Sequence, residues 1–283
     1  MAAAAALFLS LSTAEAAELK WVGCDSWNPA LASDLAAAFT GQTAIQTSPE
    51  GGDSTRGIRD VAKGAADVGC SARHKVSDPA ERDAKLVPVG WEALVVITHP
   101  SNPVERISER DLQAVLEGKI TRWNALGGPD RPIELVVRRD PVSGVGLLLR
   151  AILFEDPGHE IAKSAVAKPS SAAVEAEVER NADALAITLA GRVPARQVKA
   201  LSLDGAAPSY DNVASGQYRL VLPLYVVLPK RQTDDTKALV KFVKGSAGQQ
   251  VIKARGIVNM RDGKDLFARY QKSIAEARKK ARP

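Results

Sequence analysis

Three short turns rich in hydroxyl groups carry the residue types that could do chemistry in this chain. Each turn follows an apolar segment and precedes a predicted helix, and they lie at 24–27 (Cys-Asp-Ser-Trp), 52–55 (Gly-Asp-Ser-Thr) and 142–144 (Val-Ser-Gly). Such turns present free backbone N–H groups and the positive end of a helix dipole, so they favour an anion. Ser and Thr hydroxyls add donors, and Arg138 or Arg139 could clamp an oxyanion with two hydrogen bonds.

A fourth turn, 70–73 (Cys-Ser-Ala-Arg), follows another apolar segment. Each turn alone says little, because a Ser before a helix usually caps it and a surface Arg is usually solvated or salt-bridged. The combination is more specific, since the turns at 24–27, 52–55 and 70–73 fall in one part of the chain and the turn at 142–144, with Arg139, in another. In an open parallel sheet these turns gather at the carboxyl ends of the strands, so the sequence predicts an anion site there.

Short apolar segments alternate with helical ones along the chain. Strands are expected at 19–23, 44–47, 67–70, 93–98, 133–137, 185–189, 198–203 and 222–228. Helices are expected after the turns near 28 and 55, and at 108–118, 145–154, 234–244 and 247–254. Repeated strand–helix–strand units predict an α/β protein with a parallel, doubly wound sheet. A basic helix after Asp262 is expected to be solvated.

Composition excludes several classes of protein. The 283 residues are 45% hydrophobic and 25% charged, which is too apolar for a disordered chain. The formal net charge of +5 is far from the dense basic stripe of a nucleic-acid binder. The three histidines, His74, His99 and His159, show neither metal spacing nor a Ser-His-acid pattern. We therefore expect no enzyme, no metal and no cofactor.

The N-terminus is typical of an export signal. Residues 1–13 are apolar, and Ala14-Glu15-Ala16 has the small-x-small pattern that signal peptidase cuts. We predict a signal peptide at 1–16 and a soluble periplasmic protein. Cys24 and Cys70 follow similar segments, Val-Gly-Cys in both cases. They are either two small buried hydrophobes or, if their strands are adjacent and parallel, a disulfide, which an oxidising compartment favours.

Nearly all of the chain after the predicted signal resembles the phosphate-binding proteins of bacterial phosphate ABC importers. The motifs that carry the resemblance lie, in the family's order, at 51–58, 64–73, 91–98, 102–104, 112–123, 127–130, 139–144, 198–208, 223–225 and 246–250. The resemblance implies a type 2 periplasmic-binding-protein fold with two α/β lobes, mostly parallel central sheets and a hinge that the chain crosses twice. We expect lobe I to comprise 17–98 and 222–283, and lobe II 99–221.

The same resemblance implies the ligand contacts. They are Ser26, Trp27, Asp53, Ser54, Thr55, Ser71, Ala72, Arg139, Ser143, Gly144 and Val145. Ala72 and Val145 depart from the family, which often has an acidic or hydroxyl residue at the first position and usually Thr at the second. A carboxylate can accept the proton that hydrogen phosphate carries and sulfate lacks. Asp53, Asp25 or Asp140 could take that part here.

The function that follows is hinge-bending capture of phosphate, or a related oxyanion, by a monomer that delivers it to a membrane ABC permease. Two other classes stay open. One is a ligand-sensing or scaffold protein that keeps the fold without transport, which the departures at Ala72 and Val145 would suit. The other is a phosphatase-like hydrolase, for which the sequence offers neither an activated nucleophile nor a metal cluster.

Overall fold

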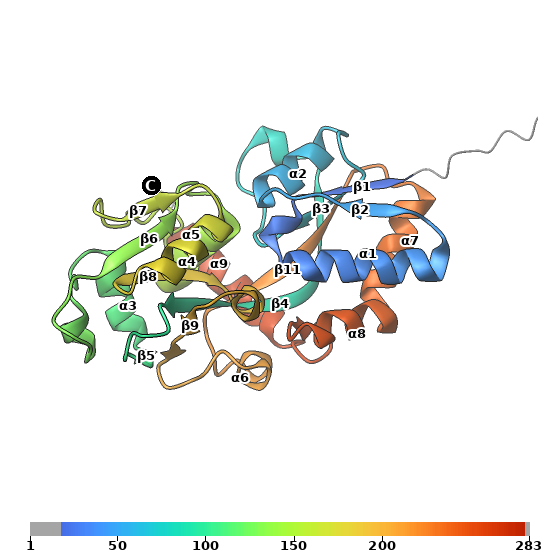
Figure 1. Cartoon of the computed structure of the whole chain (residues 1–283). Coiled ribbons are helices and arrows are strands. Elements are labelled where there is room, and N and C mark those ends of the chain that lie inside the picture. Colours follow the sequence, from blue (N-terminus) through green and yellow to red (C-terminus); the bar gives the residue numbers. More distant parts are fainter. Residues whose placement is uncertain (1–17, 281–283) are drawn as a thin grey trace, which may run out of the picture.

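The computed structural model describes residues 18–280, so the predicted signal peptide lies outside the described residues. Two α/β lobes lie side by side and share one curled sheet of ten strands (Figure 1). Eight of these strands follow the order β2-β1-β3-β11-β4-β8-β6-β7. This arrangement confirms the predicted two-lobed α/β fold.

Lobe I is built on three parallel strands and four helices. The strands are β1 (Leu19–Val22), β2 (Thr47–Pro49) and β3 (Val68–Ser71), with the helices α1 (Pro29–Thr43), α2 (Ser54–Ala62), α7 (Asp234–Lys244) and α8 (Ser246–Ala254). Short 3-10 helices lie at η1 (Cys24–Ser26) and η2 (Pro79–Glu81). Asn28 and Asp53 accept backbone N–H groups at the starts of α1 and α2, as N-caps do.

Lobe II repeats the design. Its parallel strands are β6 (Glu134–Arg138), β7 (Val166–Lys168) and β8 (Ala184–Leu189), with the helices α3 (Glu109–Leu116), α4 (Gly144–Leu153) and α5 (Ser171–Arg180). Smaller elements are β5 (Arg106–Ile107), η3 (Trp123–Leu126), η4 (Ala190–Ala195), β9 (Lys199–Ala200), β10 (Ser202–Leu203) and α6 (Tyr210–Ser215), whereas β12 (Val258–Asn259) pairs with the half of the long strand at 85–98 that adjoins lobe I. Ser143 caps α4 through Gly146 N–H.

Two long antiparallel strands connect the lobes. β4 (Lys85–Thr98) pairs through its first half with β11 (Val221–Leu228) and through its second half with β8. The strand predicted at 93–98 is therefore longer than expected and antiparallel to its neighbours. A continuous apolar run indicates that a strand is buried on both faces of a sheet. It does not tell whether the strand runs parallel or antiparallel to its neighbours. The shared strands give each lobe a fixed attachment at the hinge.

The C-terminal helix corrects one expectation. α9 (Leu266–Lys280) is not simply solvated, because Leu266, Tyr270 and Ile274 are buried. These residues recur every four positions and form one apolar face. The face packs against α4, and the Tyr270 ring lies 6.0 Å from the Trp91 ring between their centroids. The many charges around this stripe conceal it in the sequence. The predicted lobe limits remain predictions, but α9 contacts a helix of lobe II.

The two cysteines lie where β1 and β3 end. These strands are adjacent and parallel, with Val22 opposite Gly69. Cys24 and Cys70 are both buried, their Cα atoms are 5.0 Å apart, and the structure joins them by a disulfide. The bond ties the turn that follows β1 to the strand that leads into the fourth predicted turn.

Replacing both cysteines with Ala should lower the free energy of unfolding by about 2–4 kcal/mol, because the 46-residue separation leaves a large loop to constrain in the unfolded chain. Denaturant unfolding of the double variant and the parent, each with and without reductant, would measure this. Reductant should destabilise the parent and leave the variant unchanged. An equal response in the two proteins would contradict a disulfide between these residues.

Candidate anion-binding site between the lobes

The N-termini of α2 and α4 meet across the boundary between the lobes. Asp53 Oδ1 accepts hydrogen bonds from Thr55 N and Arg56 N at 3.0 and 3.1 Å, and Ser143 Oγ accepts one from Gly146 N at 3.2 Å. The first N–H groups of a helix have no partner within it, and each helix start carries a partial positive charge near half an electron. The fold therefore brings two electropositive helix ends together.

Gly144 is one point where the lobes approach each other closely. A β-carbon at this position would lie 3.0 Å from Ala72 Cβ and 3.1 Å from Ser54 Oγ, so the start of α4 rests directly on lobe I. Ser54 Oγ in turn accepts a hydrogen bond from Ala72 N at 3.0 Å. Three of the predicted ligand residues, one from lobe II and two from lobe I, thus come together. The contact also explains why a small side chain occupies position 72.

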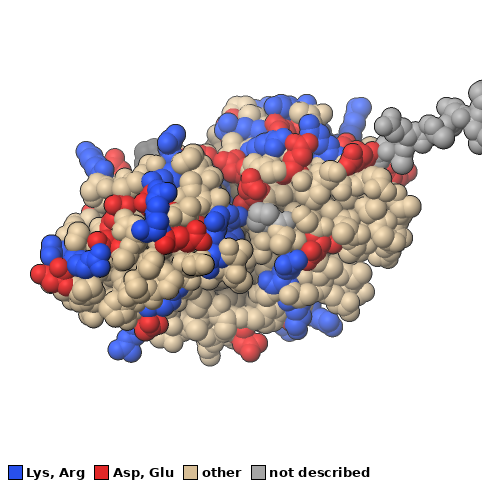
Figure 2. Space-filling view, viewed as in Figure 1, with Lys and Arg blue, Asp and Glu red and all other residues tan. Residues whose placement is uncertain are grey.

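Arg138 supplies a positive charge beside the same helix ends. Its Nη2 lies 3.8 Å from Asp53 Oδ2 across the boundary, and its Nη1 donates to Ser171 Oγ at 3.0 Å. Burial lowers the pKa of Arg138, whereas the charges of Asp53 and Asp140 raise it. Figure 2 shows basic and acidic side chains meeting along this boundary.

Arg139, which the sequence analysis put forward, lies at the rim of a pocket inside lobe II, which Arg138 also lines. Its backbone N–H donates to the Lys168 carbonyl at 2.8 Å. Arg138 is the last residue of β6 and Arg139 follows the strand, and it is the Arg138 side chain that lies near Asp53 across the boundary. Val145, another predicted ligand residue, also lines the lobe II pocket.

The first turn is occupied by its own local bonds. Ser26 Oγ donates to the Gly23 carbonyl at 2.7 Å, and Trp27 N donates to the Cys24 carbonyl at 3.2 Å. The Trp27 ring is fully buried, and its Nε1 donates to the Ser71 carbonyl at 3.0 Å. In this structure both predicted residues hold the turn in shape.

The remaining predicted residues, Ser71 and Thr55, form hydrogen bonds with Arg73 next to the start of α2. Ser71 Oγ donates to the Arg73 carbonyl, and Thr55 Oγ1 accepts from Arg73 Nη2 at 3.2 Å. Arg73 is fully buried and forms a 2.7 Å ion pair with the equally buried Glu81. Removing one partner of a buried pair leaves an uncompensated charge, so this pair firmly fixes the loop beneath the site. The pairing of Arg73 with Glu81 could not be read from the sequence, because eight positions and a loop separate the two residues.

A second arginine reaches across the boundary. Arg192 in η4 is held by Glu175 through Nε at 2.5 Å and Nη2 at 3.1 Å. Its Nη1 donates to the carbonyls of Asp25 and Trp27 in lobe I, at 3.4 and 3.3 Å. Beside it, Asn28 Nδ2 donates to the Gly191 carbonyl at 2.6 Å. These bonds fasten the first turn of lobe I to lobe II.

A buried carboxyl lies at the hinge behind these contacts. Glu92 of β4 is 3% exposed, and its Oε1 accepts bonds from Ala93 N at 3.1 Å and Gly191 N at 3.3 Å. Within the described part of the chain its Oε2 has no hydrogen-bond partner. Burial raises the pKa of Glu92 to about 7, against the smaller opposing effect of the two backbone bonds.

Within residues 18–280, no three His, Cys, Asp or Glu side chains are grouped so that they could hold a metal ion. In the same range, no helix combines the length and apolar character needed to cross a membrane.

Known proteins resemble this chain over most of its length. A family model described as a PBP superfamily domain matches residues 11–246. The phosphate-binding protein PstS of Bacillus subtilis is 27% identical over 221 residues, covering 76% of this chain and 71% of that protein. PstS of Borreliella burgdorferi is 23% identical, covering 74% of this chain and 77% of its own.

A solved structure shares the fold. The crystal structure of a phosphate ABC transporter substrate-binding protein from Clostridium perfringens, described as putative and with bound phosphate, superimposes with a TM-score of 0.77. It is 23% identical and covers 86% of this chain and 99% of that protein.

Glu92 should make stability depend on pH. Since its folded pKa lies above the usual 4.5, its protonated form favours the folded state, and the free energy of unfolding should fall as pH rises from about 4.5 to about 7. The loss should approach roughly 3 kcal/mol, at about 1.4 kcal/mol per pKa unit. Glu92→Gln should flatten the curve in this window, as measured by urea unfolding at pH 4.5 to 7.5. The same slope in both proteins would contradict this assignment.

Proposed function

Because the chain belongs to the PBP superfamily, we propose that it is an extracytoplasmic solute-binding protein that captures phosphate between its lobes and delivers it to an ABC permease. Relatives named as phosphate-binding proteins and a solved neighbour with bound phosphate support this ligand. The proposal includes export by the predicted signal peptide and action as a monomer. It involves no covalent chemistry.

One observation carries the proposal. The starts of α2 and α4 and the guanidinium of Arg138 converge on the same place, with Gly144 against Ser54 and Ala72. Two helix ends and a cation of like sign repel one another in a medium of low dielectric. An oxyanion between them accepts their N–H groups and offsets their charge, so it favours the approach of the lobes.

Asp53 is the carboxylate that we propose for selection of a protonated anion. Its Oδ1 is committed to the cap of α2, and its Oδ2 faces Arg138 across the boundary. A carboxylate there can accept the proton of hydrogen phosphate and repels a fully ionised anion such as sulfate. Asp53 would thus supply the proton acceptor that the Ala72 side chain lacks.

Capture of phosphate would depend on bending at the hinge. β4 and the return of the chain into β11 connect the lobes, and opening would separate Gly144 from Ser54, Asn28 from Gly191, and Arg192 from the first turn. Bound phosphate would shift the equilibrium to the closed form, since only that form contacts the anion from both lobes. A permease that recognises surfaces of both lobes can then distinguish the loaded protein.

Calorimetric titration of phosphate-stripped protein tests the proposed site. We expect micromolar or tighter binding of phosphate, with sulfate at least tenfold weaker. Arg138→Ala should weaken phosphate binding by roughly 10- to 100-fold, the loss of a charge-assisted bond. Arg139→Ala, the matched control one residue away, should change it less than threefold.

Asp53→Asn should narrow the gap between phosphate and sulfate. Absence of phosphate binding in the parent would remove the proposed function. If Arg139→Ala weakened phosphate binding more than Arg138→Ala, the proposed function would stand. The arginine that binds the anion would then be Arg139, as the sequence resemblance implies.

A further inference from the structure

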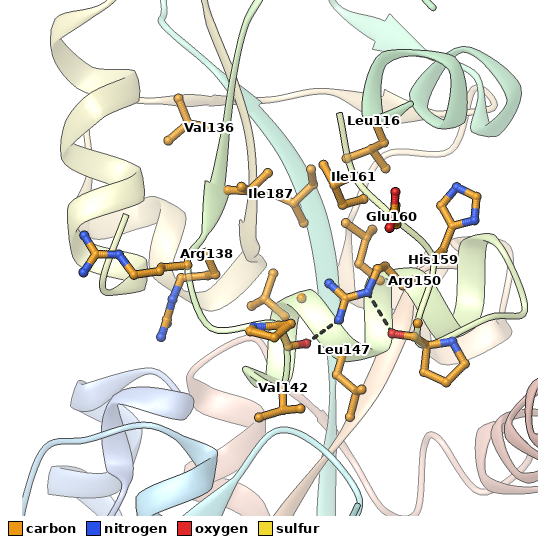
Figure 3. A pocket seen from close by; sticks show the side chains of 18 of the residues that line it. Leu116, Val136, Arg138, Val142, Leu147, Arg150, His159, Glu160, Ile161 and Ile187 are labelled. Atoms are coloured by element: carbon orange, nitrogen blue, oxygen red, sulfur yellow. Dashed lines mark hydrogen bonds between the residues drawn. The ribbon is translucent and has the colours of Figure 1, made fainter. Parts of the chain in front are cut away.

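The pocket within lobe II lies behind the helix that forms half of the proposed anion site. It has a volume of about 630 Å³, and its walls come from β6, β8, α4 and the segment 157–163 (Figure 3). Apolar side chains dominate the lining, including Val136, Val145, Leu147, Ile161 and Ile187. The size is that of pockets that hold small organic molecules.

One buried cation projects into this apolar space. Arg150 is 8% exposed, and Figure 3 shows its guanidinium directed between α4 and Ile161. Its Nε donates to the Pro157 carbonyl at 2.9 Å, and its Nη2 donates to the Pro141 carbonyl. Both acceptors are neutral, and they hold the side chain rigidly in place while leaving Nη1 for another acceptor.

The charge around the pocket is predominantly positive. Four of its lining residues are cationic, Arg138, Arg139, Arg150 and Lys163, against one carboxylate, Glu160. Asp140 and Asp156 act on Arg150 only through their charges, and burial lowers its pKa. A buried charge without an ionic partner is costly, so an anionic group that enters the pocket gains more than it would at the surface.

The wall opposite α4 is fixed before any ligand binds. The His159 ring stacks on the Phe154 ring with centroids 3.7 Å apart and planes within 9°. His159 Nε2 also lies 3.4 Å from Glu117 Oε1. These contacts anchor the segment that carries Ile161, so the pocket needs little reorganisation to receive a ligand.

We propose that this pocket binds a small carboxylic acid, with its carboxylate on Arg150 and its apolar body among Val136, Leu147, Ile161 and Ile187. The site is distinct from the proposed phosphate site at the lobe boundary, although Arg138 lies between the two and lines both. This proposal does not depend on whether the protein transports phosphate.

Phenylacetate is a suitable probe, with phenylacetamide as its uncharged counterpart and acetate as the counterpart without an apolar body. Titrations with saturation-transfer NMR and calorimetry would use the full mature protein in saturating phosphate, which occupies the proposed phosphate site. We expect saturable phenylacetate binding below 1 mM, and at least tenfold weaker binding of both counterparts.

Two variants locate the binding. Ile187→Trp fills the pocket, and Arg150→Met removes the charge, and each should weaken phenylacetate binding at least tenfold. Lys237→Ala, far away on α7, is the control, and thermal melts establish that each variant is folded. Equal binding of phenylacetamide, unchanged binding in folded Ile187→Trp, displacement of phenylacetate by phosphate, or no saturation below 10 mM would each overturn the proposal.

Discussion

The approach of two helix N-termini across the lobe boundary is the constraint on which the rest of the structure depends. A β-carbon at Gly144 would press on Ala72 and on the Ser54 hydroxyl, so the start of α4 packs closely against the start of α2 and the loop after β3. Two positive helix ends and Arg138 concentrate charge of one sign at this contact. Asp53 offsets part of it, and an anion would offset the rest. In the proposed function, the contact that holds the lobes together is also the one that would bind the anion.

The other long-range bonds help to hold the two helix N-termini in position. The disulfide holds the first turn beside β3, and the buried pair of Arg73 and Glu81 holds the loop beneath α2. Arg192, braced by Glu175, fastens the first turn to lobe II. Each of these groups acts on the position of a helix start or turn, and none needs to touch the ligand. Glu92 places a titratable group at the hinge itself.

The local features of the site could be predicted from the sequence. The caps of α2 and α4 follow from Asp53 and Ser143 before apolar helices, and the strand ends that gather them follow from the alternation of elements. What could not be predicted depends on register and distant contacts. The choice between Arg138 and Arg139 depends on how the chain turns where β6 ends, at Arg138. The bridge from Arg192 to the first turn joins residues more than 160 positions apart.

The most direct test of the account is whether phosphate closes the lobes. Small-angle X-ray scattering of phosphate-stripped protein, before and after phosphate is added, measures the radius of gyration of each state. The account predicts a decrease on adding phosphate, no decrease with equal sulfate, and a decrease that needs far more phosphate in Arg138→Ala. Phosphate binding with an unchanged radius of gyration in the parent protein would contradict capture by closure between the lobes.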